Sequence, residues 1–83
     1  MNADNELRKN LDKLHTTELG IKRIKRNLSL DIEDVVDWCK AKISSENADI
    51  TRNGKNWYVH ADNAVFTVNA YSYTIITAHK EKK

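Results

Sequence analysis

Three histidines could transfer protons near neutral pH in this chain: His15, His60 and His79. Imidazole titrates close to pH 7, so one such group can take a proton from a reacting oxygen while another returns one. We expect His60 and His79 on strands of one sheet, with Thr77 two residues before His79 and therefore on the same face. The candidate catalytic residues of a metal-independent site are thus His79, His60, Thr77 and His15.

Basic and aromatic side chains indicate what such a site would act on. Cations crowd one predicted helix, and another follows the last predicted strand. Their charges can hold a phosphate, and tyrosines on a sheet face can stack on bases. The predicted phosphate- or RNA-binding residues are Lys22, Arg23, Arg26, Tyr58, Tyr73 and Lys80.

The spacing of possible ligands argues against metal and cofactor chemistry. No two of the three histidines and the one cysteine lie within four residues of each other, so no pair has zinc-site spacing. Gly20 and Gly54 are far apart, which excludes a glycine-rich phosphate loop. A core of this size leaves little room for a haem, flavin or dinucleotide. We therefore predict no metal and no cofactor.

Length and composition place the chain among small globular domains. With 83 residues, 40% hydrophobic and 31% charged, it is expected to form a single domain over residues 1–83. No apolar run approaches the eighteen or so residues of a membrane helix, and the N-terminus lacks the regions of a secretory signal. Cys39, an expected core residue, is the only cysteine and favours a reducing compartment. We predict a cytoplasmic protein without membrane contact.

The net charge of +2 conceals a segmental pattern. Residues 1–30 carry seven Lys/Arg and four Asp/Glu (+3), residues 31–49 two and six (−4), and residues 50–83 five and two (+3). A basic surface attracts polyanions, but the pI of about 8.7 lies below the value of about 9 that marks strong nucleic-acid binders. A solvated surface of mixed charge is an equal alternative.

Helical periodicity occupies about residues 4–44. The first apolar stripe, over residues 4–14, consists of Leu7, Leu11 and Leu14. Thr16 or Thr17 can cap a second helix. Gly20 inside that helix implies the close approach of another group, or a helix that begins after it. Asp31 is the expected cap of a third helix.

From about residue 49 to residue 80 the apolar period changes to two. Asn53-Gly54 and Asp62-Asn63 each predict a two-residue turn, the first of which pairs Ile50 with Trp57. Both turns independently place the same side chains on one face of a meander: Ile50, Trp57, Val59, Phe66 and Val68.

The last strand, about residues 73–79, has two alternative registers. A three-residue turn places Ile76 and Ala78 in the core and puts Tyr73 and His79 on the outer face, whereas a two-residue turn reverses the faces. We favour the first. The predicted fold class is α+β, with N-terminal helices packed on one face of a four-stranded antiparallel meander sheet and the other face partly open.

Two stretches carry a family resemblance. The first comprises residues 14–20 (LHTTELG), followed by Arg23-Ile24 and Asn27-Leu28. The second comprises residues 54–58 (GKNWY) and 67–80 (TVNAYSYTIITAHK). Together they resemble a small bacterial family known as domain of unknown function 3781 (DUF3781), over roughly residues 7–80. The resemblance implies no activity.

The end of the chain carries a second resemblance. A helical first half, a four-stranded meander and a last strand that ends Ile-Thr-Ala-His resemble the barnase, colicin and RelE-like (BECR) group of small ribonucleases. This resemblance implies catalytic groups at Thr77 and His79 on the last strand, and at His15 or residues 22–26 on the helical side. The chain departs from that group in lacking an evident glutamate base on a central strand and in being shorter.

Two functional hypotheses follow. The first is an RNA-acting protein, in its most specific form a toxin-like, metal-independent endoribonuclease. The second is a non-catalytic module that binds a protein partner or forms a homodimer through the second helix or the open sheet face. Convergence of the three histidines on one basic cleft would favour the enzyme.

Overall fold

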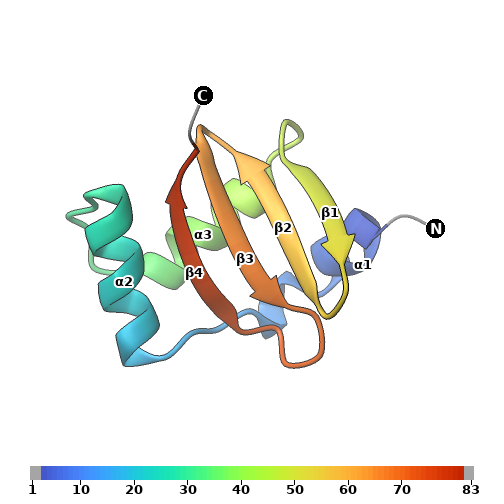
Figure 1. Ribbon diagram of the computed structural model, residues 1–83, viewed down its shortest axis with the longest axis horizontal. Coiled ribbons are helices and arrows are strands. Elements are labelled where there is room, and N and C mark those ends of the chain that lie inside the picture. Colours follow the sequence, from blue (N-terminus) through green and yellow to red (C-terminus); the bar gives the residue numbers. More distant parts are fainter. Residues whose placement is uncertain (1–2, 82–83) are drawn as a thin grey trace.

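The computed structural model describes residues 3–81 and has the predicted α+β fold (Figure 1). Its elements are α1 (Ala3–Lys9), the 3-10 helix η1 (Leu11–Lys13), α2 (Glu18–Leu28), α3 (Val35–Ile43), β1 (Asp49–Asn53), β2 (Asn56–Ala61), β3 (Ala64–Asn69) and β4 (Ile75–Lys80). The strands form one antiparallel sheet in the order β1-β2-β3-β4. Figure 1 shows α1 and α3 behind the sheet and α2 beside β4. Every helix within residues 3–81 is too short or too polar to cross a membrane.

The hydrophobic core lies between the inner face of the sheet and the helices. The sheet contributes Trp57, Val59, Phe66 and Val68, all fully buried as predicted. The helices contribute Leu7, Ile24, Val35, Cys39 and Ile43. Ile50, on the edge strand β1, is only partly buried. Each large side chain buried in this way contributes about 1.5–3 kcal/mol, so the sheet and helices stabilise each other.

The turn between β2 and β3 is the predicted one. Asp62 and Asn63 have φ angles of 52° and 60°, and two successive positive φ angles are the pattern of a type I′ turn. Ala61 pairs with Ala64, as expected. Short polar side chains tolerate this left-handed backbone, which explains why Asp-Asn suffices here without glycine.

The turn between β1 and β2 differs from the prediction. Ile50 pairs with Val59 rather than with Trp57. The turn residues are therefore Gly54-Lys55, and only Gly54 has a positive φ, of 64°. A glycine at the first central position is the requirement of a type II′ turn. Because the register moved by two residues, Ile50 keeps its predicted face.

A β-bulge in β4 replaces both alternative registers of the last strand. The pairing of β3 with β4 shifts between Thr67 and Val68, which leaves Ile76 as an extra residue. Ile75 and Ala78 are consequently both buried, at 1% and 0% exposure, whereas Ile76 is 38% exposed. The prediction for Ala78 is confirmed. The prediction that Ile76 lies in the core is wrong, because the extra residue changes which side chains face inward.

The strand β4 begins at Ile75, later than predicted. Tyr73 lies in the preceding loop with a φ of 59°, and its backbone N–H donates to the Asn69 carbonyl at 2.9 Å. Its ring packs against Trp57, with the ring centroids 5.3 Å apart. The predicted position of Tyr73 on the outer face is therefore wrong, because this loop directs the ring onto the core.

The first helical segment is interrupted near its middle. The Asn10 side chain donates to the Glu6 carbonyl at 2.8 Å, and its own backbone φ is −120°. Side-chain bonds of this kind compete with helical geometry. The predicted helix over residues 4–14 therefore forms two pieces, α1 and η1, although Leu7 and Leu14 are still both buried.

The helix α3 begins later than the sequence predicts. Its cap is Asp34, whose carboxylate accepts from the Asp37 N–H at 2.9 Å. The prediction that Asp31 caps this helix is therefore wrong. Ser29 ends α2 with a left-handed φ of 55°, and the chain then needs a non-helical stretch in which Leu30 and Ile32 pack against the core.

The start of α2 is confirmed, with Thr17 as its cap. The Thr17 hydroxyl accepts from the Gly20 N–H at 3.0 Å. The neighbouring Thr16 hydroxyl donates to the Ile75 carbonyl at 2.7 Å and occupies the space that a Cβ at residue 20 would need. The predicted close approach at Gly20 is therefore made by Thr16.

This contact predicts the effect of Gly20→Ala. Alanine favours a helix interior by about 1 kcal/mol over glycine. We nevertheless expect the free energy of unfolding to fall by about 1–2 kcal/mol, because the Thr16 hydroxyl must rotate and leave the Ile75 carbonyl without its donor. Urea unfolding measures the change. In a Thr16→Ala background the same substitution should cost nothing, so an equal loss in both backgrounds would contradict the explanation.

Candidate functional site

The outer face of the sheet carries rows of mainly polar side chains. His60 lies opposite Val65, and Val65 lies opposite His79; we call these three residues the histidine row. The two histidines are two strands apart, about 10 Å between Cα atoms. The adjacent row consists of Thr51, Tyr58, Thr67 and Thr77. Among the described residues, no helix covers this face (Figure 1).

Both histidines of this row are held through the same ring nitrogen. His60 Nδ1 lies 2.9 Å from a Glu81 carboxylate oxygen, and His79 Nδ1 lies 3.1 Å from the Lys80 carbonyl. A carboxylate and a carbonyl only accept hydrogen bonds, so each Nδ1 carries a proton and donates it. The two Nε2 atoms remain for other partners. Either ring can therefore accept a proton at Nε2 when neutral, and can donate one when protonated.

The helix α2 lies along β4, beside the histidine row. The Asn27 amide nitrogen donates to the Ala78 carbonyl at 3.1 Å and to the Thr77 hydroxyl at 3.4 Å. Arg23 lies one helical turn earlier, on the same side of α2 as Asn27. The geometry therefore brings Thr77 and the surface of α2 together next to His79.

Three cations form an exposed surface on α2, which we call the basic stripe: Lys22, Arg23 and Arg26. None of the ion pairs formed among the described side chains, those of residues 6–81, involves this helix. An exposed cation without a carboxylate partner is free to bind an external anion. The stripe therefore remains available to a phosphate.

His15 takes part in a separate network at the other end of β4. Its Nδ1 lies 3.0 Å from the Lys13 carbonyl and its Nε2 lies 3.0 Å from the Thr74 hydroxyl. The Thr74 hydroxyl lies 2.8 Å from that of Ser72, which donates to the Asn69 side chain at 3.1 Å. These contacts fasten the loop between β3 and β4 to the segment that precedes α2.

The three histidines therefore do not share one cleft. His15 pairs with Thr74, and Thr74 lies about 16 Å along β4 from His79 at about 3.3 Å per residue. Only His60 and His79 share one end of one face. Among residues 3–81, no three histidine, cysteine or acidic side chains are placed to hold a metal ion.

The other predicted binding residues divide between the outer face and the core. Tyr58 is half-buried on the outer face, two residues from His60. Lys80 is exposed at the end of β4, directly after His79. Tyr73 packs on the core, with the Lys13 ammonium 5.5 Å from its ring centroid. Tyr58 therefore shares the outer face with the histidine row, whereas Lys80, which pairs with Ala64, points to the opposite side of the sheet.

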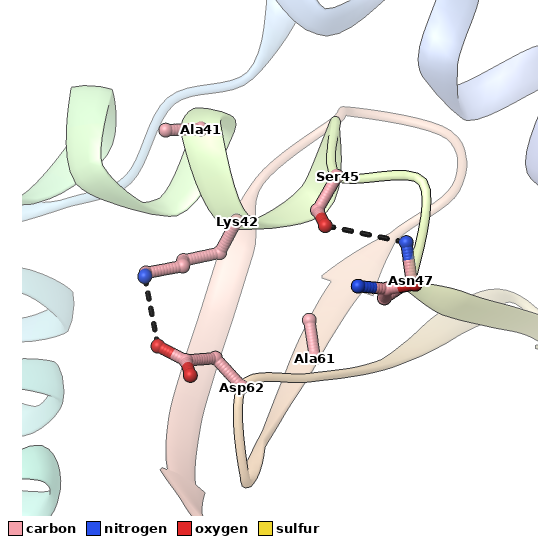
Figure 2. Close-up of a pocket in the computed structure, with 6 residues that line it drawn as sticks. All are labelled: Ala41, Lys42, Ser45, Asn47, Ala61 and Asp62. Atoms are coloured by element: carbon pink, nitrogen blue, oxygen red, sulfur yellow. Dashed lines mark hydrogen bonds and ion pairs between the residues drawn. The ribbon is translucent and has the colours of Figure 1, made fainter.

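Two hollows flank Asp62 at the end of the sheet. The first, of about 370 Å³, lies between α3 and the β2–β3 turn and is shown in Figure 2. The Lys42 ammonium reaches across it to the Asp62 carboxylate, at 2.7 Å (Figure 2). The second, of about 270 Å³, includes Asp62, Lys80 and Glu81 in its lining. The second hollow therefore borders the residues that hold the histidine row.

Sequence reasoning missed Glu81 as the partner of His60. Glu81 lies 21 residues from His60, and its backbone N–H donates to the Asn63 carbonyl at 2.9 Å. The predicted Asp62-Asn63 turn was the available signal. This turn places residue 63 at the end of β3, but it identifies Glu81 as the neighbour of residue 63 only when the pairing of β3 with β4 is known. That pairing depends on the bulge.

The chain matches the model of a known protein family over a range that includes nearly all of these site residues. Its model, described as "Protein of unknown function (DUF3781)", matches residues 8–79. No curated protein and no solved structure matches the chain. The matched range includes the three histidines and the basic stripe, and ends just before Lys80 and Glu81.

Proposed function

The chain belongs to the DUF3781 family, and because the description of that family assigns no activity, we propose from the geometry that the protein acts on RNA as a metal-independent endoribonuclease. One observation carries the proposal. His60 and His79 share one face, each is held at Nδ1, and among the described side chains neither Nε2 has a partner; Asn27 of α2, the helix that carries the basic stripe, bonds to β4 directly before His79. The arrangement pairs two proton-transfer groups with phosphate-binding charge.

The proposed reaction is an internal transfer at the RNA backbone. Neutral His60 takes the proton of a 2′-hydroxyl at Nε2 while Glu81 holds its Nδ1–H. The 2′-oxygen forms a bond to the adjacent phosphorus, and the bond from phosphorus to the 5′-oxygen breaks. His79, protonated, gives its Nε2 proton to that leaving oxygen. The products are a 2′,3′-cyclic phosphate and a 5′-hydroxyl, and proton transfer of this kind contributes about 10²–10⁴-fold in rate.

The remaining residues of this surface position the RNA. The basic stripe neutralises backbone phosphates, and the Tyr58 ring offers a surface on which a base can stack. The Thr77 hydroxyl, already bonded to Asn27, can donate to a phosphate oxygen next to His79.

The test is RNA cleavage by the purified protein in the presence of EDTA. We expect products that end in a 2′,3′-cyclic phosphate, and no cleavage of the same strand made with 2′-deoxyribose. Replacing the three residues of the basic stripe with Gln should raise KM at low salt. A control that replaces Lys9, Lys40 and Lys55 with Gln has the same net charge and should retain the wild-type KM. Background-level cleavage by the wild-type protein would overturn the proposal.

A specific observation also supports the non-catalytic alternative, an oligomerisation module. Among residues 3–81, the backbone groups of β1 bond only to β2, so its outer edge is open. Open edges are templates for pairing with another chain. A second copy could extend the sheet there. Sedimentation equilibrium distinguishes the two: a strict monomer at high concentration contradicts this alternative.

A further inference from the structure

Cations and aromatic rings alternate at the end of the sheet where the β1–β2 turn and the β3–β4 loop lie next to each other (Figure 1). The Lys13 ammonium lies 5.5 Å from the Tyr73 ring centroid, which is 5.3 Å from that of Trp57. The Arg52 guanidinium lies 5.7 Å from the Trp57 centroid and 5.7 Å from the Tyr71 centroid. These cation–ring distances are within the range of about 6 Å for cation–π contacts. We call these five residues the cation–aromatic cluster.

Arg52 is held in place while its terminal nitrogens are unused. Its Nε–H donates to the Gly54 carbonyl at 2.7 Å, and this is its one side-chain hydrogen bond among residues 6–81. Within the same range, neither Arg52 nor Lys13 forms an ion pair with a carboxylate. A guanidinium fixed in this way loses little entropy when its terminal N–H groups bind a phosphate.

The β3–β4 loop presents the Tyr71 ring to solvent from a fixed backbone. The Asn69 side-chain oxygen accepts from the backbone N–H groups of Tyr71 and Ser72, each at 3.0 Å. The Ala70 N–H donates to the Lys55 carbonyl at 2.8 Å, which fastens this loop to the β1–β2 turn. The Tyr71 side chain is nevertheless 75% exposed. One of its neighbours is the Arg52 cation, so the ring is an open platform next to a positive charge.

An exposed ring beside unpaired cations is the usual means of binding single-stranded nucleic acid, because every base can stack and every nucleotide carries a phosphate. A protein interface would instead need an apolar centre. Among residues 6–81, the other exposed large hydrophobic residues are Leu19 and Ile76, which lie on α2 and β4. The surroundings of Tyr71 therefore favour a nucleic acid over a protein partner.

We propose that the cation–aromatic cluster binds single-stranded RNA, with a base stacked on Tyr71 and a backbone phosphate on Arg52. The inference rests on the proposed function for the identity of its ligand, but it names a second contact. His60 follows Trp57 by three residues on β2, so it lies about 10 Å further along the strand and on the opposite face. The cluster therefore contributes to binding and takes no part in the reaction.

Tyr71→Ala tests the stacking contact. The ligand is a fluorescently labelled single strand of 2′-O-methyl RNA, which the proposed reaction cannot cleave, and fluorescence anisotropy gives Kd. We expect Kd to rise about 5- to 100-fold in Tyr71→Ala, the usual loss for one stacked base. Tyr71→Phe keeps the ring and should bind within about twofold of the wild type. An unchanged Kd in Tyr71→Ala, or an equal loss in Tyr71→Phe, overturns the stacking contact.

Arg52→Gln tests the phosphate contact through its dependence on salt. The slope of log Kd against the logarithm of the salt concentration should fall by about 0.7, the share of one phosphate on a single strand. Lys40→Gln removes the same charge from α3, whose neighbouring Lys42 pairs with Asp62 at the other end of the sheet, and should keep the wild-type slope. A slope that Arg52→Gln leaves unchanged overturns the phosphate contact.

The binding and cleavage assays separate this inference from the proposed function. Binding that depends on Tyr71, together with background-level cleavage of RNA, overturns the reaction and leaves this contact in place. Cleavage together with binding that neither substitution weakens does the reverse. Binding of a glutamate-rich peptide that depends on Tyr71, without binding of the RNA strand, would show that the cluster takes an acidic protein and would overturn the inference.

Discussion

His79→Ala is expected to lower kcat/KM for RNA cleavage by about 10²–10⁴-fold, the usual contribution of one general acid or base. His60→Ala should cause a loss of similar size, because the proposed reaction needs one group to take the 2′ proton and another to protonate the leaving oxygen. The double variant should lose little beyond the larger single loss, since groups that act as a unit are not additive.

The pH profile of this activity follows from the same roles. The reaction needs one imidazole neutral and the other protonated, so kcat/KM should pass through a maximum and fall on both sides of it. Each single variant should lose one limb of the profile. Added imidazole should restore part of the His79→Ala rate, since His79 is exposed. Unchanged rates and profile in both variants, with unchanged thermal stability, would show that the histidine row is not catalytic.

The sheet illustrates which structural features can be predicted from a single sequence. Alternation of apolar residues determines the faces of β2 and β3, and an even shift in register leaves those faces unchanged. That is why Ile50 keeps its face although its partner is Val59. The bulge at Ile76 has no comparable signal, because it adds one residue inside a run whose neighbouring isoleucines are chemically identical.

Local sequence patterns predicted part of the candidate site. The position of His60 on the outer face follows from alternation, and the exposure of the basic stripe follows from helical periodicity, whereas the face of Thr77 depended on the choice between two registers of the last strand. The hydrogen bond that His60 donates to Glu81 and the separation of His15 from the other histidines depend on which ends of the strands meet. Both features belong to the tertiary structure, and they are determined by the loop at Asn69 and by the bulge in β4.

The buried thiol of Cys39 gives the second large effect, on stability at alkaline pH. Cys39 has 0% exposure on the core side of α3. Burial raises the pKa of its thiol from 9.0 to about 12, because the core does not solvate a thiolate. The native state therefore keeps the proton to a higher pH than the unfolded state. Between pH 9 and 12 the unfolded chain binds fewer protons, so the free energy of unfolding must fall as the pH rises.

The size of that fall follows from the shift in pKa. Each unit corresponds to about 1.4 kcal/mol, so the loss between pH 9 and 12 approaches about 4 kcal/mol, a large share of the stability of a domain this small. Guanidinium unfolding at intervals from pH 7 to 11, with a reductant present, measures the part of this loss that falls below pH 11, about 3 kcal/mol. Cys39→Ala should be less stable at pH 7 because of the cavity it leaves, yet should lack this part of the alkaline decline. Parallel declines in both proteins would mean that the thiol is not the group responsible.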